Sequence, residues 1–180
     1  MTDRPRRWHH RPTHVFLPNT MYFVTAGTMN KAPFFDQPAR RELLQDALHE
    51  VAVAYDWRLE AWAVFANHYH FIGLSPDRGR TLKRMIQRLH SQTSREVNRL
   101  DERRGRKVWF QYRDTCLTYE NSYFARLNYV NENAVKHDMA AVAHAYPYCS
   151  ASWFKAEADP THRRKVESFR WDQLQITDDF

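Results

Sequence analysis

The sequence predicts an α+β domain in which helices pack on one face of an antiparallel β-sheet. Segments with strand periodicity alternate with segments of helical periodicity, and their order is strand, helix, hairpin, helix, strand, helix. This order is close to a ferredoxin-like split β-α-β layout, and 180 residues are enough for one hydrophobic core. The predicted elements are strands at 21–28, 57–65, 68–74 and 108–118 and helices at 39–55, 81–103 and 121–137.

The first half of the chain supplies a strand, a helix and a hairpin. Residues 21–28, MYFVTAGT, are rich in β-branched and aromatic side chains, which favour strands. Residues 39–55 follow a proline-bounded break and repeat leucine, alanine and valine at helical spacing. Ala66 and Asn67 form a short, turn-competent link between the next two strands, which predicts a hairpin.

The second half supplies two helices around a further strand. The helix at 81–103 carries an apolar stripe, and its arginines lie largely off that stripe. The helix at 121–137 completes the predicted core, and the segments after Ala140 are short elements of uncertain type. The chain therefore divides into a basic N-terminal arm at 1–20, a main domain at 21–153 and a C-terminal extension at 154–180.

Basic residues crowd one part of the chain, which suggests a polyanionic partner. The formal net charge is +6 and aromatic residues make up 14% of the chain, a combination suited to phosphates and unstacked bases. Trp109 has two interpretations that the sequence leaves open, base stacking and sheet core. The residues expected to contact nucleic acid are Arg84, Arg88, Arg95, Arg103, Arg104, Arg106, Lys107, Trp109, Arg126 and Lys136.

The sequence also predicts a cytoplasmic protein without a membrane segment. No apolar run approaches the length of a membrane span, and the basic N-terminus is not followed by an apolar signal core. The two cysteines form no CxxC pair, so a reducing compartment is expected. His9, His10 and His14 in the arm are expected to be solvated or to contact nucleic acid.

The strand at 68–74 carries His68 and His70 in the stretch ANHYHFIGL. Residues two apart in a strand point to the same face, so both imidazoles point at one spot while Tyr69 points to the opposite face. The two histidines are either satisfied structural residues or ligands of something charged in front of them.

Tyr129 lies on a polar arc of the last helix. At roughly 100° per residue, the packing face is a separate arc of Tyr123, Leu127, Val130 and Ala134. The simplest interpretation is a half-exposed tyrosine on an amphipathic helix. Asn133 lies one turn from Tyr129, and with the two histidines it would supply three ligands to a divalent cation. The polar arc contains Ser122, Arg126, Tyr129, Asn133 and Lys136.

These residues together meet the requirements of phosphodiester cleavage by a tyrosine. A phenol is a weak nucleophile unless its proton is removed or its charge is stabilised, and a metal ion neutralises phosphate charge. Two neutral imidazoles and an amide oxygen leave a bound Mg²⁺ or Mn²⁺ nearly fully charged, with open positions for phosphate. Arg126 and Lys136 are suited to hold flanking phosphates.

Four stretches resemble a known family. ANHYHFIGL resembles the histidine–hydrophobic–histidine motif of the HUH single-strand endonucleases, and NYVNENAVKH at 128–137 looks like the tyrosine helix of their single-tyrosine transposase branch. VWFQYRDT at 108–115 and YPYCSASW at 146–153 are similar to two further stretches of that branch. The spacing of these stretches resembles that of the REP-associated tyrosine transposases, over about residues 21–153.

The resemblance implies a ferredoxin-like or RNA-recognition-like core and metal-dependent cutting of single-stranded DNA. It implies a 5′-phosphotyrosine intermediate on Tyr129 and a released 3′-hydroxyl, with His68, His70 and Asn133 as ligands of Mg²⁺ or Mn²⁺. The implied partner is a DNA hairpin with a short single-stranded flank, bound by a monomer or a homodimer. Two positions depart from the family pattern: Tyr69 replaces an aliphatic residue, and Ala134 replaces the proline that commonly follows the helix asparagine.

Other interpretations remain open. A zinc site built on His68 and His70 would need a third ligand, for which Cys116 is a candidate. Tyr119 and Tyr123 are further tyrosines near the last helix, but neither has polar neighbours like those of Tyr129. A catalytically silent relative that binds hairpin DNA, or an RNA-binding module on a similar sheet, would be alternatives in function, although the glycines of an RNP motif are absent.

Overall fold

A computed structural model describes residues 16–78, 81–170 and 174 of the chain. The predicted strands and helices are all present, and their ends lie within three residues of the expected ones. Most of the basic arm, including His9, His10 and His14, lies outside the described residues. The elements are β1 (Met21–Thr28), α1 (Pro38–Ala54), β2 (Arg58–Val64), β3 (His68–Leu74), α2 (Leu82–Leu100), β4 (Trp109–Leu117), α3 (Glu120–Lys136), α4 (Ala151–Glu157) and α5 (Pro160–Glu167), with short 3₁₀ helices at Met29–Lys31 and Ala143–Ala145.

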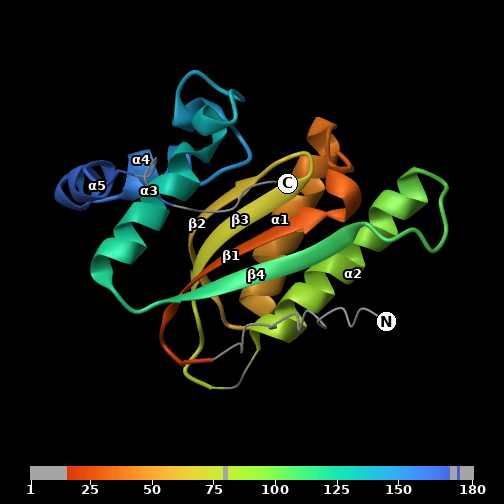
Figure 1. Ribbon diagram of the computed structural model, residues 1–180, viewed down its shortest axis with the longest axis horizontal. Helices are drawn as coiled ribbons and strands as arrows, with labels where there is room; N and C mark the ends of the chain where they lie inside the picture. The colour runs from red at the N-terminus through yellow and green to blue at the C-terminus, as the bar shows by residue number, and fades with distance from the viewer. Residues whose placement is uncertain (1–15, 79–80, 171–173, 175–180) are drawn as a thin grey trace, which may run out of the picture.

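The four strands form one antiparallel sheet in the order β2-β3-β1-β4 (Figure 1). Strand β3 pairs with both β1 and β2, so the hairpin strand lies between the two strands that α1 connects. This is the split β-α-β arrangement, and it confirms the predicted fold class. The topology places β3, the histidine strand, inside the sheet and away from both edges.

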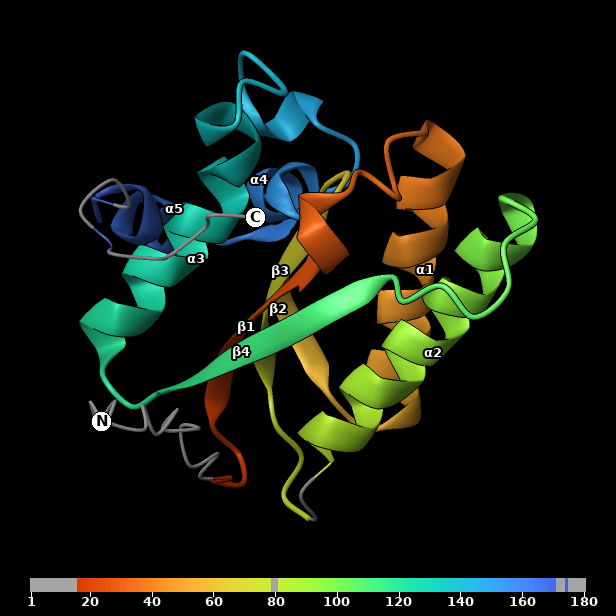
Figure 2. The ribbon, with the colours of Figure 1, turned by 45° about the vertical axis from the view of Figure 1, so that its right-hand side comes forward.

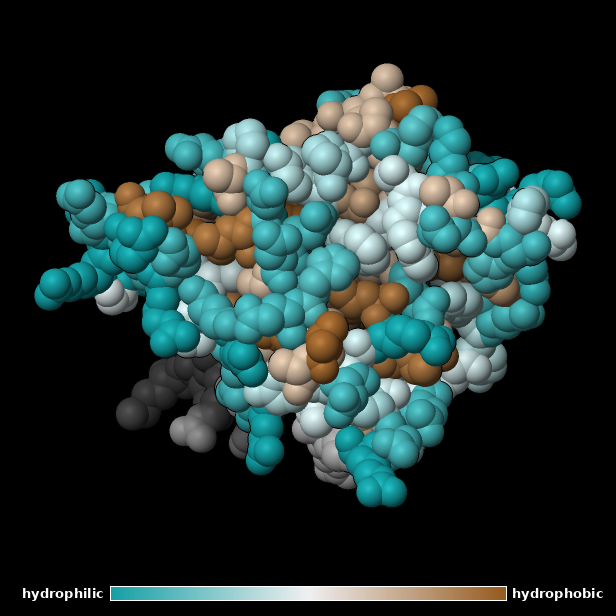
Figure 3. Space-filling view, turned by 180° about the vertical axis from the view of Figure 1, so that it is seen from behind, coloured by the Kyte–Doolittle hydropathy of each residue, from teal (hydrophilic) through white to brown (hydrophobic). Residues whose placement is uncertain are grey.

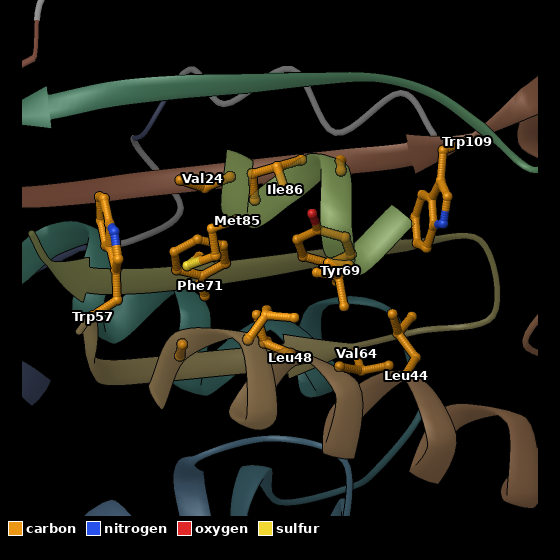
Figure 4. Close-up of a cluster of buried hydrophobic side chains, with 14 of the residues drawn as sticks. Val24, Leu44, Leu48, Trp57, Val64, Tyr69, Phe71, Met85, Ile86 and Trp109 are labelled. Atoms are coloured by element: carbon orange, nitrogen blue, oxygen red, sulfur yellow. The ribbon is translucent and has the colours of Figure 1, made fainter. Parts of the chain in front are cut away.

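Helices α1 and α2 cover one face of the sheet and bury its larger hydrophobic cluster. The side chains that point toward these helices come from alternate strand positions, among them Val24, Tyr69 and Phe71, and they meet Leu48 and Ile86 (Figure 4). Tyr69 therefore points away from the histidine face, as expected, and its hydroxyl pairs with His90 Nε2 at 3.0 Å. Seen from behind, the molecular surface is mainly hydrophilic, with small hydrophobic patches (Figure 3).

Helix α3 lies against the opposite face, together with α4 and α5 (Figure 2). The sheet is thus covered on both sides, with the two earlier helices on one face and the tyrosine helix on the face that carries His68 and His70. The expectation that all helices pack on one face is wrong in this respect, because the apolar side of α3 needs a sheet face of its own to pack against. A second hydrophobic cluster fills the space between α3 and the sheet. It includes Phe23 from β1, Ile72 from β3 and Leu127 and Val130 from α3.

The segment after α3 ties that helix to the edge of the sheet. Cys149 forms an isolated bridge with Ala63 of β2, and Ser150 N donates to Trp62 O at 2.8 Å. The Ser150 hydroxyl also donates to Asn131 Oδ1 of α3 at 2.7 Å. The stretch YPYCSASW, whose structure the sequence left open, therefore covers the β2 edge and anchors α3.

Trp109 lies in the core, which decides between its two interpretations. Its side chain is 5% exposed, its ring stacks on His90 at 4.4 Å, and its Nε1 donates to the Thr93 hydroxyl at 2.9 Å. The register of β1 with β4 shifts between Ala26 and Thr28, so the β-bulge turns the Trp109 side chain toward α2. The expected contact of Trp109 with nucleic acid is therefore wrong for this structure.

Among the described residues, none of the helices has the length and apolarity of a membrane-spanning segment.

The bond between Trp109 and Thr93 gives a test of the core. Thr93 is 1% exposed, and Thr93→Val keeps its shape but leaves the Trp109 N–H without its acceptor. We expect the free energy of unfolding to fall by about 1–3 kcal/mol, the usual cost of a buried unsatisfied donor. Urea unfolding measures it, with Thr118→Val at an exposed position as the control. Equal stabilities of the two variants would show that the bond contributes nothing.

Candidate active site

His68 and His70 lie on the α3 face of β3, as their spacing predicts. Their ring centroids are 5.0 Å apart, and the side chains are 4% and 0% exposed. The His70 ring stacks on Phe23 of β1 at 5.8 Å, and the His68 ring stacks on Phe65 at 4.6 Å. Phe23 on the adjacent strand β1 and Phe65, directly after β2, therefore fix the orientation of the two imidazoles.

Asn67 sets the proton position on His68. The Asn67 amide nitrogen donates to Lys31 O at 3.3 Å, so its Oδ1 is the atom that faces His68 Nδ1, at 2.8 Å. Because an amide oxygen only accepts, His68 Nδ1 carries the proton and Nε2 keeps the lone pair. Metal-binding histidines are commonly oriented in this way, by a hydrogen bond to the ring nitrogen that does not bind the ion. The sequence predicted only a turn role for Asn67.

Both imidazoles are held in the neutral form that binds metal ions. The pKa of His68 is lowered to about 3, mainly by burial and in smaller part by the nearby His137 and Lys136. Burial also lowers the pKa of His70 well below its ordinary value, with contributions from His68, His137 and Lys136. At neutral pH the pair is uncharged, so protons do not compete for the ring nitrogens.

Tyr129 lies beside the histidine pair within the same chain. Its ring packs edge-on against His70, with centroids 5.6 Å apart, and edge-on against Phe23 at 6.1 Å. The hydroxyl accepts a hydrogen bond from Lys136 Nζ at 3.3 Å, and the same ammonium lies 4.7 Å from the ring centroid. The phenol oxygen thus lies next to a positive charge that can stabilise a phenolate.

The burial of Tyr129 corrects the expectation of a half-exposed side chain. The residue is 1% exposed because its helix face turns toward the sheet, and the ring joins the hydrophobic cluster between α3 and the strands. A helical wheel separates faces but does not say which layer covers each of them. Lys136 is exposed, so it lies between the phenol oxygen and solvent.

Asn133 is the residue that best supports a cation near the histidines. It is 0% exposed, and neither its Oδ1 nor its Nδ2 has a hydrogen-bond partner among the described residues. A buried amide without partners costs free energy unless something binds it. The amide and the neutral imidazoles are ligand types that suit a divalent ion. In the described ranges, no three His, Cys, Asp or Glu side chains lie together as a ready ligand set.

Helix α3 places Asn133 over the histidine pair. Tyr129, Asn133 and His137 are four residues apart and share one helix face. Tyr129 packs on His70, and the His137 ring packs on His68 with centroids 5.0 Å apart. Asn133 lies between the two contacts along the helix, and it is fully buried on the side of α3 that packs against the histidine strand.

His137 belongs to this cluster, although sequence reasoning did not single it out. It caps the C-terminus of α3, and its ring also packs edge-on against Phe65 at 5.2 Å. Burial lowers its pKa, as does Lys136. The signal was present in the sequence as the four-residue repeat Tyr129, Asn133, His137.

Cys116, the candidate third zinc ligand, does not join the cluster. It lies opposite Tyr22 on β1 and packs against the cluster on the α1 and α2 face of the sheet. The histidines point to the other face. The structure therefore does not support Cys116 as a ligand for them.

The arginines expected to bind phosphates divide into two groups. Arg126 lies on the site face, where its Nη1 donates to Ser122 Oγ at 2.6 Å and its guanidinium lies 5.9 Å from the Phe23 ring. Arg84, Arg88 and Arg95 lie on α2, in the helix layer on the far side of the sheet, and Arg88 pairs with Glu50 at 2.9 Å.

The segment after α2 carries the remaining basic residues. Arg103, Arg104 and Lys107 are exposed, whereas Arg106 donates to Asn98 Oδ1 at 2.9 Å and pairs with Asp101. Arg106 therefore has a role within the fold. A shallow hollow at this end of α2 is lined by Arg95, Asn98, Arg99, Glu102, Arg103, Arg104 and Gly105.

A protein-family model and two solved structures match this chain. Residues 17–136 match the model of a protein family described as "Transposase IS200 like". The fold is similar to a solved structure of a REP-associated tyrosine transposase bound to a REP hairpin, with a TM-score of 0.66, 14% sequence identity and coverage of 87% of each chain. A crystal structure of a protein from Deinococcus radiodurans R1, described as a transposase, matches with a TM-score of 0.42 and 16% identity, over 68% of this chain and 96% of that one. A search of curated protein sequences gives no match.

The neutral histidines make folding stability depend on pH. Because the folded-state pKa of His68 is about 3, below the ordinary value of 6.5, the unfolded chain binds more protons in acid. We expect the metal-free protein to lose stability as the pH falls below about 6.5, by about 2 kcal/mol at pH 5 for this one imidazole. Urea unfolding at pH 7 and pH 5 in a chelating buffer measures the loss.

The variant His68→Asn/His70→Asn should show a smaller loss, whereas His144→Asn, at an exposed position, should behave like the wild type. A double variant as sensitive to acid as the wild type would contradict the neutral buried pair.

Proposed function

We propose that this chain, which belongs to the IS200-like transposase family of HUH endonucleases, cuts and rejoins single-stranded DNA through a covalent bond to Tyr129. The observation that carries the proposal is the contact of Tyr129 with His70, in one chain, beneath the Lys136 ammonium. A structural core has no need for a phenol, an amide and two imidazoles on one buried face.

In the proposed reaction, Tyr129 Oη attacks a phosphodiester and forms a bond to phosphorus. The bond from phosphorus to the 3′ oxygen breaks, so the products are a 5′-phosphotyrosine and a strand with a free 3′-hydroxyl. The phenol gives up its proton during the attack, and the leaving 3′ oxygen takes up a proton to become the hydroxyl, so the numbers of protons balance. In the reverse direction a 3′-hydroxyl attacks the phosphotyrosine, which rejoins a strand and restores the phenol.

The family generally uses a divalent metal ion. In this chain His68, His70 and Asn133 would hold it, and a bound Mg²⁺ or Mn²⁺ would neutralise phosphate charge and polarise a phosphoryl oxygen. Asn67 keeps the His68 Nε2 lone pair available through its hydrogen bond to Nδ1. The neutral state of both imidazoles allows ligation at physiological pH.

Lys136 has a second role in the proposal besides phosphate contact. Its ammonium donates to Tyr129 Oη and so favours the phenolate over the phenol. Because Lys136 also lies between the hydroxyl and solvent, it has to move aside when a phosphate approaches. Arg126, one turn before Tyr129 on α3, is proposed to contact a neighbouring phosphate, a role that its guanidinium on the site face supports.

We propose hairpin DNA with a single-stranded flank as the substrate. The solved structure with the similar fold is described as bound to a REP hairpin. In this chain the exposed Arg103, Arg104 and Lys107 supply positive charge at one end of α2, with Arg95 beside them. These residues are proposed to grip backbone phosphates, which position a nucleic acid without reading its sequence.

One observation favours an alternative function, a protein that binds hairpin DNA without cutting it. Tyr129 is 1% exposed, so the hydroxyl is not accessible until Lys136 or α3 moves. The presence of Asn133 and both histidines at the same place favours the enzyme instead. The two functions differ in whether a covalent product forms.

The test of the proposed function is covalent attachment to DNA. We expect the wild type, incubated with single-stranded palindromic repeats and Mn²⁺, to form an adduct that survives a denaturing gel. Tyr129→Phe should abolish the adduct and leave DNA binding unchanged, because only the nucleophilic oxygen is lost. Tyr119→Phe, at a tyrosine that is 77% exposed, is the matched control.

An adduct that persists in Tyr129→Phe would refute the nucleophile assignment. Binding without any adduct in the wild type, over a range of repeats and metal ions, would support the binding-only alternative.

The exposed arginines predict the salt dependence of DNA binding. Each lost phosphate contact lowers the slope of log K against log [salt] by roughly 0.7 to 0.9. Arg103→Ala/Arg104→Ala should therefore lower the slope by about 1.5, measured by fluorescence anisotropy with a labelled hairpin. Arg163→Ala/Arg164→Ala on α5 is the control pair. If only the control pair changes the slope, the phosphate contacts lie on the α5 side instead of at Arg103 and Arg104.

A further inference from the structure

His137 occupies a position that the proposed function does not use. It lies at the C-terminal end of α3, where the ring faces His68 with centroids 5.0 Å apart and an interplanar angle of 66°. Its Nε2 is buried and has no hydrogen-bond partner among the described residues. A buried ring nitrogen without a partner, next to two other imidazoles, is unusual for a residue that only caps a helix.

The separation of the rings fits ligands of one ion. With metal–nitrogen bonds of about 2.0–2.1 Å, two imidazoles on the same ion have ring centroids roughly 5 Å apart. The separations of His68 from His70 and of His68 from His137 are both 5.0 Å. The described residues contain no group of three His, Cys, Asp or Glu side chains already placed as a ligand set, so the proposal requires the His137 ring to turn. His137 is only half-buried and can turn its ring without disturbing β3.

Asn133 is the second observation that points to a ligand. Its amide is fully buried without a partner among the described residues, and it lies one turn before His137 on the same face of α3. The helix thus presents two side chains with unused polar atoms to the strand that carries His68 and His70. These four side chains lie on the facing surfaces of α3 and β3.

We propose that His137 supplies a third imidazole to the cation site of His68, His70 and Asn133, and that it shifts the preference of this site from Mg²⁺ to ions that favour nitrogen ligands. Magnesium prefers oxygen ligands, whereas imidazole suits zinc, cobalt and similar ions. Three imidazoles and one amide oxygen form a nitrogen-rich set. The inference rests on the proposed metal site and adds a ligand and a metal preference to it.

The experiment is titration of the DNA-free protein with Co²⁺ and with Mg²⁺. Isothermal calorimetry gives the dissociation constants, and the visible absorption of Co²⁺ reports its ligand set independently of any activity. We expect His137→Ala to weaken Co²⁺ binding about 10- to 100-fold, to change the Co²⁺ spectrum and to leave Mg²⁺ binding nearly unchanged. His144→Ala, at an exposed histidine outside the cluster, should match the wild type.

Two further variants make the outcomes distinguishable. His137→Gln keeps most of the side-chain volume, and it replaces His137→Ala if thermal unfolding without metal shows that the alanine variant is misfolded. His68→Ala/His70→Ala should lose Co²⁺ binding altogether.

If His68→Ala/His70→Ala loses Co²⁺ and the His137 variants keep wild-type affinity and spectrum, His137 is only a helix cap and this inference is wrong. If His68→Ala/His70→Ala binds Co²⁺ as the wild type does, the proposed metal site itself is wrong.

Discussion

The packing of α3 across β3 is the constraint on which the candidate site depends. Residues two apart in a strand are separated by roughly 6.6 Å, and residues four apart in a helix by about 6 Å. One helical repeat therefore advances about as far as the step from His70 to His68, so Tyr129 packs on His70 while the His137 ring, two repeats further along α3, still reaches His68. Ser150 strengthens this arrangement, because its hydroxyl links Asn131 of α3 to the segment that pairs with β2. The segment around Cys149 and Ser150 thus helps to hold α3 in place without supplying a reacting group.

This arrangement costs stability. Two imidazoles and an amide lie on a buried face, where unsatisfied polar groups and charges are unfavourable. The imidazoles meet part of the cost by staying neutral, and Asn67 satisfies one ring nitrogen of His68. Asn133 has no hydrogen-bond partner among the described residues, so nothing there offsets the cost of burying its amide. A ligand that binds this face would recover the cost, which is why a buried polar cluster in an otherwise hydrophobic layer indicates function.

The sequence predicted the fold and the residues of the site better than it predicted their surroundings. Periodicity was enough for the four strands and for α1, α2 and α3, but not for the short helices α4 and α5, and the two-residue spacing was enough to place His68 and His70 on one face. The wheel grouped Tyr129 with Asn133 and Lys136, but it could not show that this arc faces the sheet, because burial depends on which layers meet. Trp109 was ambiguous for a similar reason: a register shift, which periodicity does not encode, turns it into the core. His137 was missed because it lies at the helix end, where a cap is the usual explanation.

The central claim is that the phenol of Tyr129 reacts with DNA, and peptide mapping of the covalent product tests it most directly. Trypsin cleaves after Arg126 and Lys136, which gives a peptide, residues 127–136, with Tyr129 as its one tyrosine. Mass spectrometry of the digested adduct should find the nucleotide on this peptide. Tyr119 and Tyr123 share the preceding peptide, residues 114–126. A nucleotide on residues 114–126, or on any peptide other than 127–136, would contradict the account.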